Sequence, residues 1–249
     1  MTRLYSQVVA TEVHDEGWAE LILNRPERKN AITGPLGEGL AAALSDLNSD
    51  DDVRVIVFRG AGGAFCSGLD LNAFSADPAP VWLPEFQNLW RNAHKALFNT
   101  RKPVIGALER YAINGGAALA LACDLLVVGE GAFIQVGEAQ IGMAAPYNLA
   151  WMSLRHTESK MAQIALVGDR IYGPEMLSLQ LAQTCVPDSE VLDKACELAQ
   201  RLADYPAGGL GQIKSGLRAR IPLAADEWFD QFMVHGSTPK PPPPRSMAD

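Results

Sequence analysis

Two glycine-rich segments hold the residues whose types and spacing are suited to chemistry. Residues 60–71 read GAGGAFCSGLDL directly after an apolar run, and residues 112–124 read AINGGAALALACD, in which two glycines precede an alanine-rich stretch. Glycine turns let backbone amides point outward, and a helix start offers unpaired N–H groups with positive potential. Two such sources of amides are suited to holding an oxygen atom that becomes negative during a reaction.

The same letters exclude several other kinds of site. Phe65 stands where the dinucleotide-binding pattern GxGxxG needs its third glycine, and the P-loop pattern and the GxSxG pattern of serine hydrolases are absent. The sequence contains neither HExxH nor clustered His and Cys residues, and its four cysteines are widely spaced without a CxxC pair. We therefore expect no metal site and no disulfide framework.

The elements that must position these segments alternate between strand-like and helix-like patterns, which predicts an α/β protein. The pattern predicts strands at residues 18–23, 53–58, 104–108 and 125–128, and helices at residues 85–99, at 115–123 and along the stripe Leu36, Leu40, Leu44 and Leu47. The proline-rich segment 75–84, which contains Trp82, interrupts the alternation. It is either a cover over a pocket or a surface loop packed on its own tryptophan.

Beyond Pro187 the pattern becomes wholly helical. One predicted helix carries Val191, Ala195, Leu198 and Leu202 on one face, and others span residues 210–217 and 225–234. Residues 238–249 contain four consecutive prolines, which predict an extended tail. We therefore divide the chain into a core at residues 1–187, a helical region at 188–237 and a proline-rich tail at 238–249.

Length, composition and charge narrow the class of protein. A chain of 249 residues with 48% hydrophobic residues can form a full core, and a formal net charge of -8 disfavours nucleic acid as a partner. The first residues lack the apolar stretch of a signal peptide, and no apolar run approaches the roughly 20 residues that a membrane-spanning helix needs. We therefore expect a cytoplasmic protein that binds neither nucleic acid nor membrane. Arg25, Arg28 and Lys29 offer a local basic patch for an anionic ligand.

Together and in this order, the two glycine-rich segments resemble the crotonase (enoyl-CoA hydratase/isomerase) family. The resemblance extends to NRPERKNA at residues 24–31, FIQVGEAQIG at 133–142 and GDR at 168–170, and it covers about residues 21–202. It implies a crotonase-like spiral of ββα units followed by a C-terminal helical region, assembled as a homotrimer or hexamer. It also implies an acyl-CoA substrate, with coenzyme A as part of the substrate and no separate cofactor.

The family's functional positions carry over to this chain one by one. The resemblance implies an oxyanion hole at the amides of Leu69 and Gly115. Family hydratases use two glutamates, and the matching positions here are Ala118, whose methyl group moves no proton, and Glu138. A single carboxylate predicts isomerase-like chemistry, as in family members that shift a 3-enoyl-CoA double bond to the 2-position. The remaining residues of the implied substrate site are Arg28, Cys66, Gly68, Asp70, Leu71, Asn114 and Ala118.

Other interpretations stay open at this point. The chain could hydrolyse a carbon–carbon bond of a β-dicarbonyl compound on the same fold, or act as a non-catalytic binding or scaffold protein. Among single residues, Glu138 could be a solvated acid at a strand end, and Asn114 could either bind substrate or cap its helix. For His94 and His156 we expect packing or surface roles, and for Cys66 the role of a small loop residue rather than a nucleophile.

Overall fold

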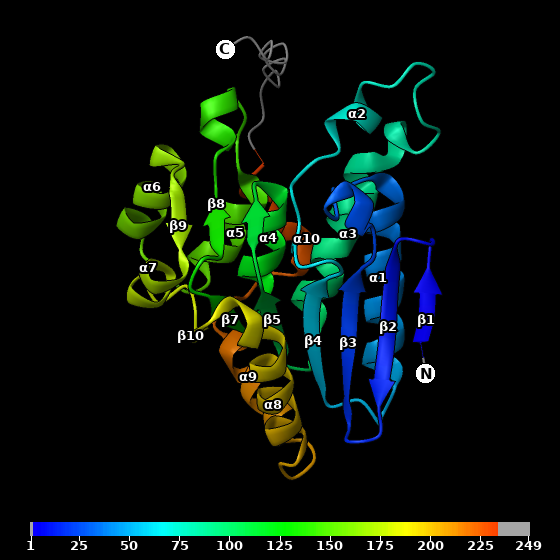
Figure 1. Cartoon of the computed structure of the whole chain (residues 1–249), viewed down its shortest axis with the longest axis vertical. Helices are drawn as coiled ribbons and strands as arrows, with labels where there is room; N and C mark the ends of the chain where they lie inside the picture. The colour runs from blue at the N-terminus through cyan, green and yellow to red at the C-terminus, as the bar shows by residue number, and fades with distance from the viewer. Residues whose placement is uncertain (1, 234–249) are drawn as a thin grey trace.

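The computed structural model describes residues 2–233 and places a seven-stranded sheet through the molecule (Figure 1). The strands lie in the order β1-β2-β3-β4-β5-β7-β10. The strands β1 to β3 pair antiparallel, and those from β3 onwards pair parallel. The bounds are Thr2–Tyr5 (β1), Val9–His14 (β2), Trp18–Leu23 (β3), Val55–Gly60 (β4), Val104–Leu108 (β5), Leu125–Gly129 (β7) and Thr184–Val186 (β10).

The central strands are largely apolar because both faces of the sheet are covered, and their two charged residues, Glu20 of β3 and Arg59 of β4, pair with each other. Ile56 and Phe58 of β4 belong to the main core, whereas Val55 and Val57 of the same strand belong to a second core on the opposite face. Above the main core, α1 (Gly34–Ser49) packs against α3 (Phe86–Asn99). The predicted leucine stripe of α1 is fully buried there, at Leu36, Leu40, Leu44 and Leu47.

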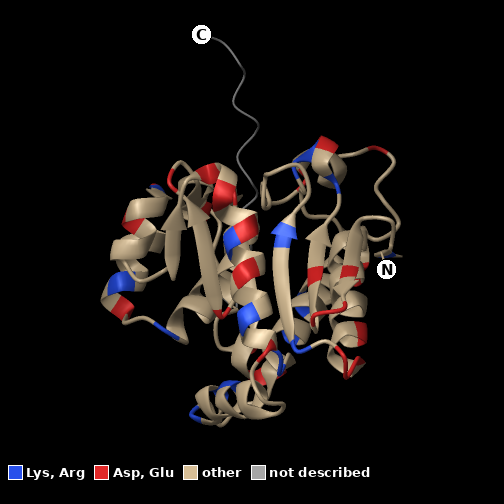
Figure 2. Cartoon of the chain, turned by 60° about the horizontal axis from the view of Figure 1, so that its bottom comes forward, with Lys and Arg blue, Asp and Glu red and all other residues tan. Residues whose placement is uncertain are grey.

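The helix α8 (Val191–Ala203) covers the second face of the sheet. Its small buried residues Ala195, Ala199 and Ala203 allow a close approach to β4 and β5, and Leu198 and Leu202 lie partly buried beside them. Acidic and basic residues are interspersed over this side of the molecule (Figure 2). The boundary predicted near residue 187 therefore separates two sequence patterns, while α8 itself packs directly on the sheet.

A smaller sheet and several helices complete the described part of the chain. The smaller sheet has the order β6-β8-β9, with β6 and β8 parallel. The strand β6 leads directly into the second glycine-rich turn, and β8 pairs beside it. The remaining bounds are Leu71–Phe74 (α2), Tyr111–Ile113 (β6), Gly115–Ala122 (α4), Phe133–Gln135 (β8), Pro146–Ser153 (α5), Glu158–Val167 (α6), Arg170–Tyr172 (β9), Gly173–Ser178 (α7), Gly209–Ala219 (α9) and Ala225–Asp230 (α10), with short 3-10 helices at Pro26–Arg28 (η1), Leu83–Glu85 (η2), Glu138–Ile141 (η3) and Asp188–Glu190 (η4).

Several predicted elements have different bounds in the structure. The strand predicted at 53–58 lies two residues later, because Gly60 still pairs with Leu23 of β3. The last predicted helix, 225–234, ends at Asp230, and the predicted tail at 238–249 lies outside the described residues. In the segment 75–84, Trp82 packs edge-on against Phe74 of α2, which favours the interpretation of a loop packed on its own tryptophan.

Candidate active site

The two glycine-rich segments meet where β4 ends and α4 begins. Ile113 donates a backbone hydrogen bond of 3.0 Å to the carbonyl of Cys66. A Cβ atom on Gly116 would lie 2.5 Å from the same carbonyl oxygen, so only glycine permits this approach. Gly68 has a φ of +88° and lies against the carbonyl of Ile113, so the first turn also needs glycine at this position.

Two backbone amides at this junction, those of Leu69 and Gly115, have no hydrogen-bond partner among residues 2–233. Leu69 forms an isolated parallel bridge with Ile32, in which Ile32 donates to the carbonyl of Gly68 at 2.8 Å and accepts from the amide of Asp70 at 3.0 Å. This pattern leaves the Leu69 N–H unused. Gly115 is the first residue of α4, where an N–H group has no partner within the helix. Both amides can therefore donate to a ligand.

Asn114 joins the second glycine turn to the segment that carries Glu138. Its backbone has φ 53° and ψ -117°, a sparsely populated conformation that stores strain. It stands at the N-cap position of α4, but its side chain makes no capping hydrogen bond, so the capping role considered for it is wrong. Its Oδ1 instead accepts from the N–H of Gly137 at 2.9 Å. Asn114 thus holds the turn before Gly115 against the turn before Glu138.

Glu138 begins η3 and is only 7% exposed, so its interpretation as a solvated acid is wrong. Its Oε1 accepts a hydrogen bond of 2.8 Å from Nδ2 of Asn148, and its Oε2 is buried without a partner in the described part of the chain. Burial raises the pKa of Glu138 to about 7, although a backbone hydrogen bond and Asn148 act in the opposite direction. The carboxyl group therefore exchanges its proton near neutral pH.

Asn148 belongs to the site although the sequence did not point to it. It lies on α5, is 1% exposed, and its Nδ2 donates a second hydrogen bond of 3.1 Å to the carbonyl of Asn114. Its two partners are 10 and 34 residues away in the chain, so no local pattern reveals them. The available signal is a polar residue directly before the apolar run LAWM.

Ala118 lies in α4 and is fully buried. Its N–H donates to the carbonyl of Asn114 at 3.1 Å as part of the first helical turn. The helix α4 contains no carboxylate, so the position that the resemblance matches to a second glutamate carries none.

Asp70 forms ion pairs with two basic residues of the segment 24–31. It accepts hydrogen bonds from Arg28 at 2.9 Å, from Arg25 at 3.0 Å and from the amide of Ala73 at 3.2 Å. Burial disfavours its charged form, but the bonds from Arg28, Ala73 and Arg25 outweigh burial and hold the pKa of Asp70 below its usual value. Two of the three cations in the predicted basic patch are thus already paired, while Lys29 is exposed.

Leu71 and Cys66, two further predicted substrate-site residues, differ in accessibility. Leu71 is the first residue of α2 and is 67% exposed, which leaves it free to contact a ligand. Cys66 is fully buried, and burial raises the pKa of its thiol to about 12. A thiol with this pKa remains protonated at neutral pH, in agreement with its expected role as a small loop residue.

Of the two candidate histidines, His94 has a packing role in the core. His94 is completely buried, accepts a hydrogen bond of 2.9 Å from Nε1 of Trp151 and stacks on Tyr147 at 4.1 Å. Burial lowers the pKa of His94 to about 3, so the ring is neutral. His156 is half-buried, and burial followed by Lys160 and Arg155 lowers its pKa as well.

Residues 2–233 contain neither a cluster of metal-ligating side chains nor a helix that could span a membrane. No group of three or more His, Cys, Asp or Glu side chains in this range is arranged to hold a metal ion. Within the same range, no helix combines the length and the apolar character that crossing a membrane requires.

Known proteins are similar to this chain in sequence and in fold. The family model for enoyl-CoA hydratase/isomerase matches residues 14–236. The probable peroxisomal enoyl-CoA hydratase 1 of Arabidopsis thaliana is 32% identical over 208 residues, which cover 83% of this chain and 77% of the relative. The chain belongs to the enoyl-CoA hydratase/isomerase family. The 1,2-epoxyphenylacetyl-CoA isomerase of Escherichia coli K12 is 30% identical over 220 residues, covering 87% of this chain and 84% of the relative.

The fold of the family is confirmed by a solved structure. The crystal structure of an enoyl-CoA hydratase from Mycobacterium avium subsp. paratuberculosis superimposes with a TM-score of 0.79 at 24% identity, covering 90% of each chain. The predicted crotonase-like fold is therefore confirmed, and so is the prediction of an enzyme of this family. Relatives named as hydratase and as isomerase both match the chain, so the family alone leaves the reaction open.

Proposed function

We propose that this enzyme binds an acyl-CoA thioester, stabilises its enolate with the amides of Leu69 and Gly115, and moves a proton with Glu138. The reaction that fits these groups best is the shift of a 3-enoyl-CoA double bond to the 2-position. The observation that carries the proposal is the buried carboxyl of Glu138, whose Oε2 has no partner among the described residues and whose pKa is about 7.

The proposed reaction needs one base and one pair of hydrogen-bond donors. The carboxylate of Glu138 removes a proton from C2 of the 3-enoyl thioester, and the electrons of that C–H bond move to the thioester oxygen through C1. The oxyanion accepts hydrogen bonds from Leu69 and Gly115, and the loss of one such donor costs roughly 3 kcal/mol of transition-state stabilisation. The enolate then takes the proton back at C4, which yields the 2-enoyl thioester and restores the carboxylate.

The pKa of Glu138 suits this task. A base removes a proton most effectively when its pKa is near the working pH, because it is then both unprotonated and sufficiently basic. A glutamate with an ordinary pKa would be a much weaker base. Since the proton returns to the product and no electrons leave the substrate, the reaction needs no cofactor beyond the coenzyme A of the substrate itself.

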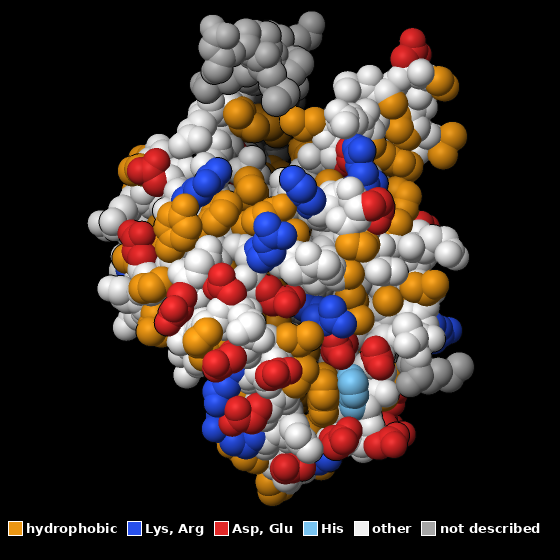
Figure 3. Space-filling view, in the orientation of Figure 1, with side chains coloured by type: hydrophobic (Ala, Val, Ile, Leu, Met, Phe, Trp, Pro, Cys, Tyr) orange, Lys and Arg blue, Asp and Glu red, His pale blue; other side chains and the backbone are white. Residues whose placement is uncertain are grey.

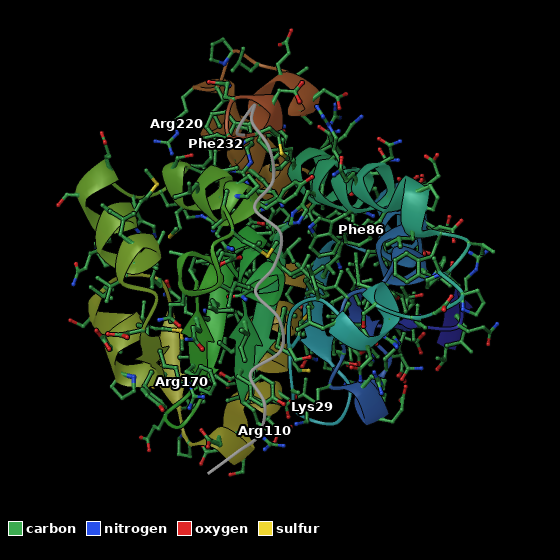
Figure 4. The ribbon with its side chains drawn as sticks, turned by 90° about the horizontal axis from the view of Figure 1, so that it is seen from above. Lys29, Phe86, Arg110, Arg170, Arg220 and Phe232 are labelled. Carbon is green, nitrogen blue, oxygen red and sulfur yellow. The ribbon has the colours of Figure 1, made fainter. Side chains whose placement is uncertain are left out.

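The distribution of charge supports an anionic ligand despite the net charge of -8. On the face in Figure 3, acidic side chains are most numerous in the lower half, whereas several basic side chains lie among apolar ones in the upper half. Lys29, Arg110 and Arg170 lie along one edge of the molecule when it is seen from above (Figure 4). Arg110 also lies against the first glycine turn, since a Cβ atom on Gly63 would be 3.1 Å from its Cδ. Phosphate groups of coenzyme A find complementary charge on this side.

A substrate panel with a matched pair of variants tests the proposal. Wild-type protein should convert 3-enoyl-CoA to 2-enoyl-CoA faster than it hydrates 2-enoyl-CoA, and Glu138→Gln should lower that rate by about 100-fold to 10,000-fold. Glu109→Gln is the control, because Glu109 is half-buried and burial raises its pKa as well, but it lies outside the site. Undiminished turnover by folded Glu138→Gln would contradict the proposed role of this residue.

The same panel separates the two alternatives. Cleavage of a β-dicarbonyl compound also passes through an enolate, so the free amides and the unpartnered Oε2 of Glu138 are compatible with it. A carbon–carbon hydrolase should release two carbonyl products from such a compound and leave 3-enoyl-CoA unchanged. A binding or scaffold protein should turn over neither compound while still raising its melting temperature with acetoacetyl-CoA.

A further inference from the structure

Asn148 touches both halves of the proposed site with one amide group. Its Nδ2 donates to Oε1 of Glu138 at 2.8 Å and to the carbonyl of Asn114 at 3.1 Å. Asn114 directly precedes Gly115, whose amide has no partner among the described residues. Both N–H groups of the Asn148 amide are therefore directed at the proton carrier and at the turn that presents the oxyanion donor.

We propose that Asn148 is a positioning residue that fixes the carboxyl of Glu138 relative to the amide of Gly115. The inference rests on the proposed function and adds a requirement to it. An enolate reaction needs the base and the oxyanion donor at a fixed separation, and small displacements of either group lower the rate strongly. Sharing one side chain between the two turns supplies that fixed separation.

The surroundings of Asn148 hold it in one orientation. It is 1% exposed, and Trp151 of the same helix is buried and bonded to His94. Tyr147, next to Asn148, stacks on His94 as well. A buried side chain that makes two hydrogen bonds, on a helix held by packed aromatic rings, has little rotational freedom. Its direction is therefore set by α5 and not by the flexible end of a surface loop.

Among residues 2–233, no charged side chain contributes to the pKa of Glu138. The helices α4 and α5 contain no ionisable side chain other than the phenol of Tyr147, and η3 contains no ionisable group besides Glu138. The helix α6, which packs against η3, carries Glu158 and Lys160, yet neither contributes to the pKa of Glu138. The pKa of this carboxyl is raised by burial and lowered by a backbone hydrogen bond and by Asn148.

Three substitutions test this role through the pH dependence of kcat/KM, whose acidic limb reports the base in the free enzyme. Asn148→Leu removes the donor at similar size, so the limb should move up by about one pH unit, and kcat should fall about 10-fold to 100-fold. KM should change less than about 3-fold, since Asn148 does not contact the ligand in this proposal. Asn148→Asp has the size of asparagine but adds a like charge, so its limb should move further. Asn148→Gln keeps the amide and should restore part of kcat.

The outcomes separate this inference from the proposed function. Asn48→Leu is the control, because the Asn48 amide donates at 3.1 Å to Thr100 at a distant place in the fold and should leave the limb unchanged. If Glu138→Gln is inactive while the Asn148 variants keep the wild-type limb and differ only in the amount of folded enzyme, the role of Asn148 is structural and this inference is wrong. If Glu138→Gln remains active, the proposed function itself is wrong. If Asn148→Leu fails to fold, the acidic limb of the isosteric Asn148→Asp still tests the positioning role.

Discussion

Glu138 lies in an environment that disfavours its charged form, and the proposed reaction uses the resulting pKa. Its carboxyl is buried, one oxygen has no partner within residues 2–233, and its pKa is about 7 instead of 4.5. A pKa that is raised on folding means that the folded state binds the proton more tightly than the unfolded state. The residue therefore adds no stability above neutral pH and works against folding there.

This sign leads to a prediction about stability. Wild-type protein should lose free energy of unfolding as the pH rises from about 4.5 to about 7, and Glu138→Gln, which cannot ionise, should not show this loss. The variant should be more stable than wild type at pH 8 by up to about 3 kcal/mol and nearly equal to it below pH 4.5. Urea unfolding at the two pH values measures the difference, with the exposed Glu158→Gln as control. An equal difference at both pH values would contradict the buried, shifted carboxyl.

The absence of a carboxylate at Ala118 leads to a second prediction about a single residue. Ala118→Glu places a second carboxylate where family hydratases have one and should raise hydration of 2-enoyl-CoA relative to isomerisation of 3-enoyl-CoA. Because Ala118 is fully buried, we expect the larger side chain to lower the free energy of unfolding by about 1–3 kcal/mol. Product ratios measured beside Ala118→Gln, which has the same size without the charge, isolate the carboxylate. An unchanged ratio would mean that position 118 does not face the substrate.

The sequence predicted the types of these residues better than their contacts. Leu69, Gly115 and Glu138 were implied by the family resemblance, which rests on motifs that are each continuous in the chain. The cap expected for Asn114 is wrong because its partner, Gly137, lies 23 residues away and is brought near only by the pairing of β6 with β8. Asn148 could not be predicted for the same reason, since both of its partners are distant in sequence.

At the scale of elements, long apolar patterns were informative and short ones were not. The strands β3 and β5 have the predicted bounds, because segments of five or six mostly apolar residues indicate a buried strand. The strands β6, β8 and β9 have three residues each, too few for any periodicity, yet β6 and β8 position Asn114 and Glu138. The elements that fix the site are thus the ones with the weakest sequence signal.

The contact between the two glycine turns gives a prediction at this scale. Gly116→Ala places a Cβ atom 2.5 Å from the carbonyl oxygen of Cys66, so the turns must separate. We expect a loss of about 2 kcal/mol or more in the free energy of unfolding and a lower kcat. Gly216→Ala in α9 is the matched control, because its Cβ atom meets nothing within 4 Å and should stabilise that helix by about 0.5–1 kcal/mol. Equal stability of both variants would contradict the close approach.

The whole molecule exposes apolar side chains that a single chain does not use. Ile213 and Leu217 lie one turn apart on α9 and are 66% and 63% exposed, and Leu166 at the end of α6 is 76% exposed. Large exposed apolar side chains on one helix face indicate a contact with another protein surface. They agree with the homotrimer or hexamer that the family resemblance implies.

Light scattering tests this assembly. We expect the mass of a homotrimer or hexamer at micromolar concentration, and a lower mass for the double variant Ile213→Glu and Leu217→Glu, because buried charges without partners oppose association. Val81→Glu serves as control, since Val81 is 98% exposed in a different part of the chain and should leave the mass unchanged. A monomeric wild-type protein would remove the prediction of assembly without affecting the proposed chemistry.

The order of the large sheet also bears on how the chain folds while it is being made. Its strands β1, β2, β3, β4, β5, β7 and β10 lie side by side in the order in which the ribosome delivers them. Each new strand can therefore join the growing edge without waiting for a later one to insert between earlier strands. Until Thr184–Val186 has been synthesised, the apolar strand β7 remains an open edge, and such edges recruit other chains. A nascent chain that stalls between residues 129 and 184 would thus be most vulnerable to aggregation at β7.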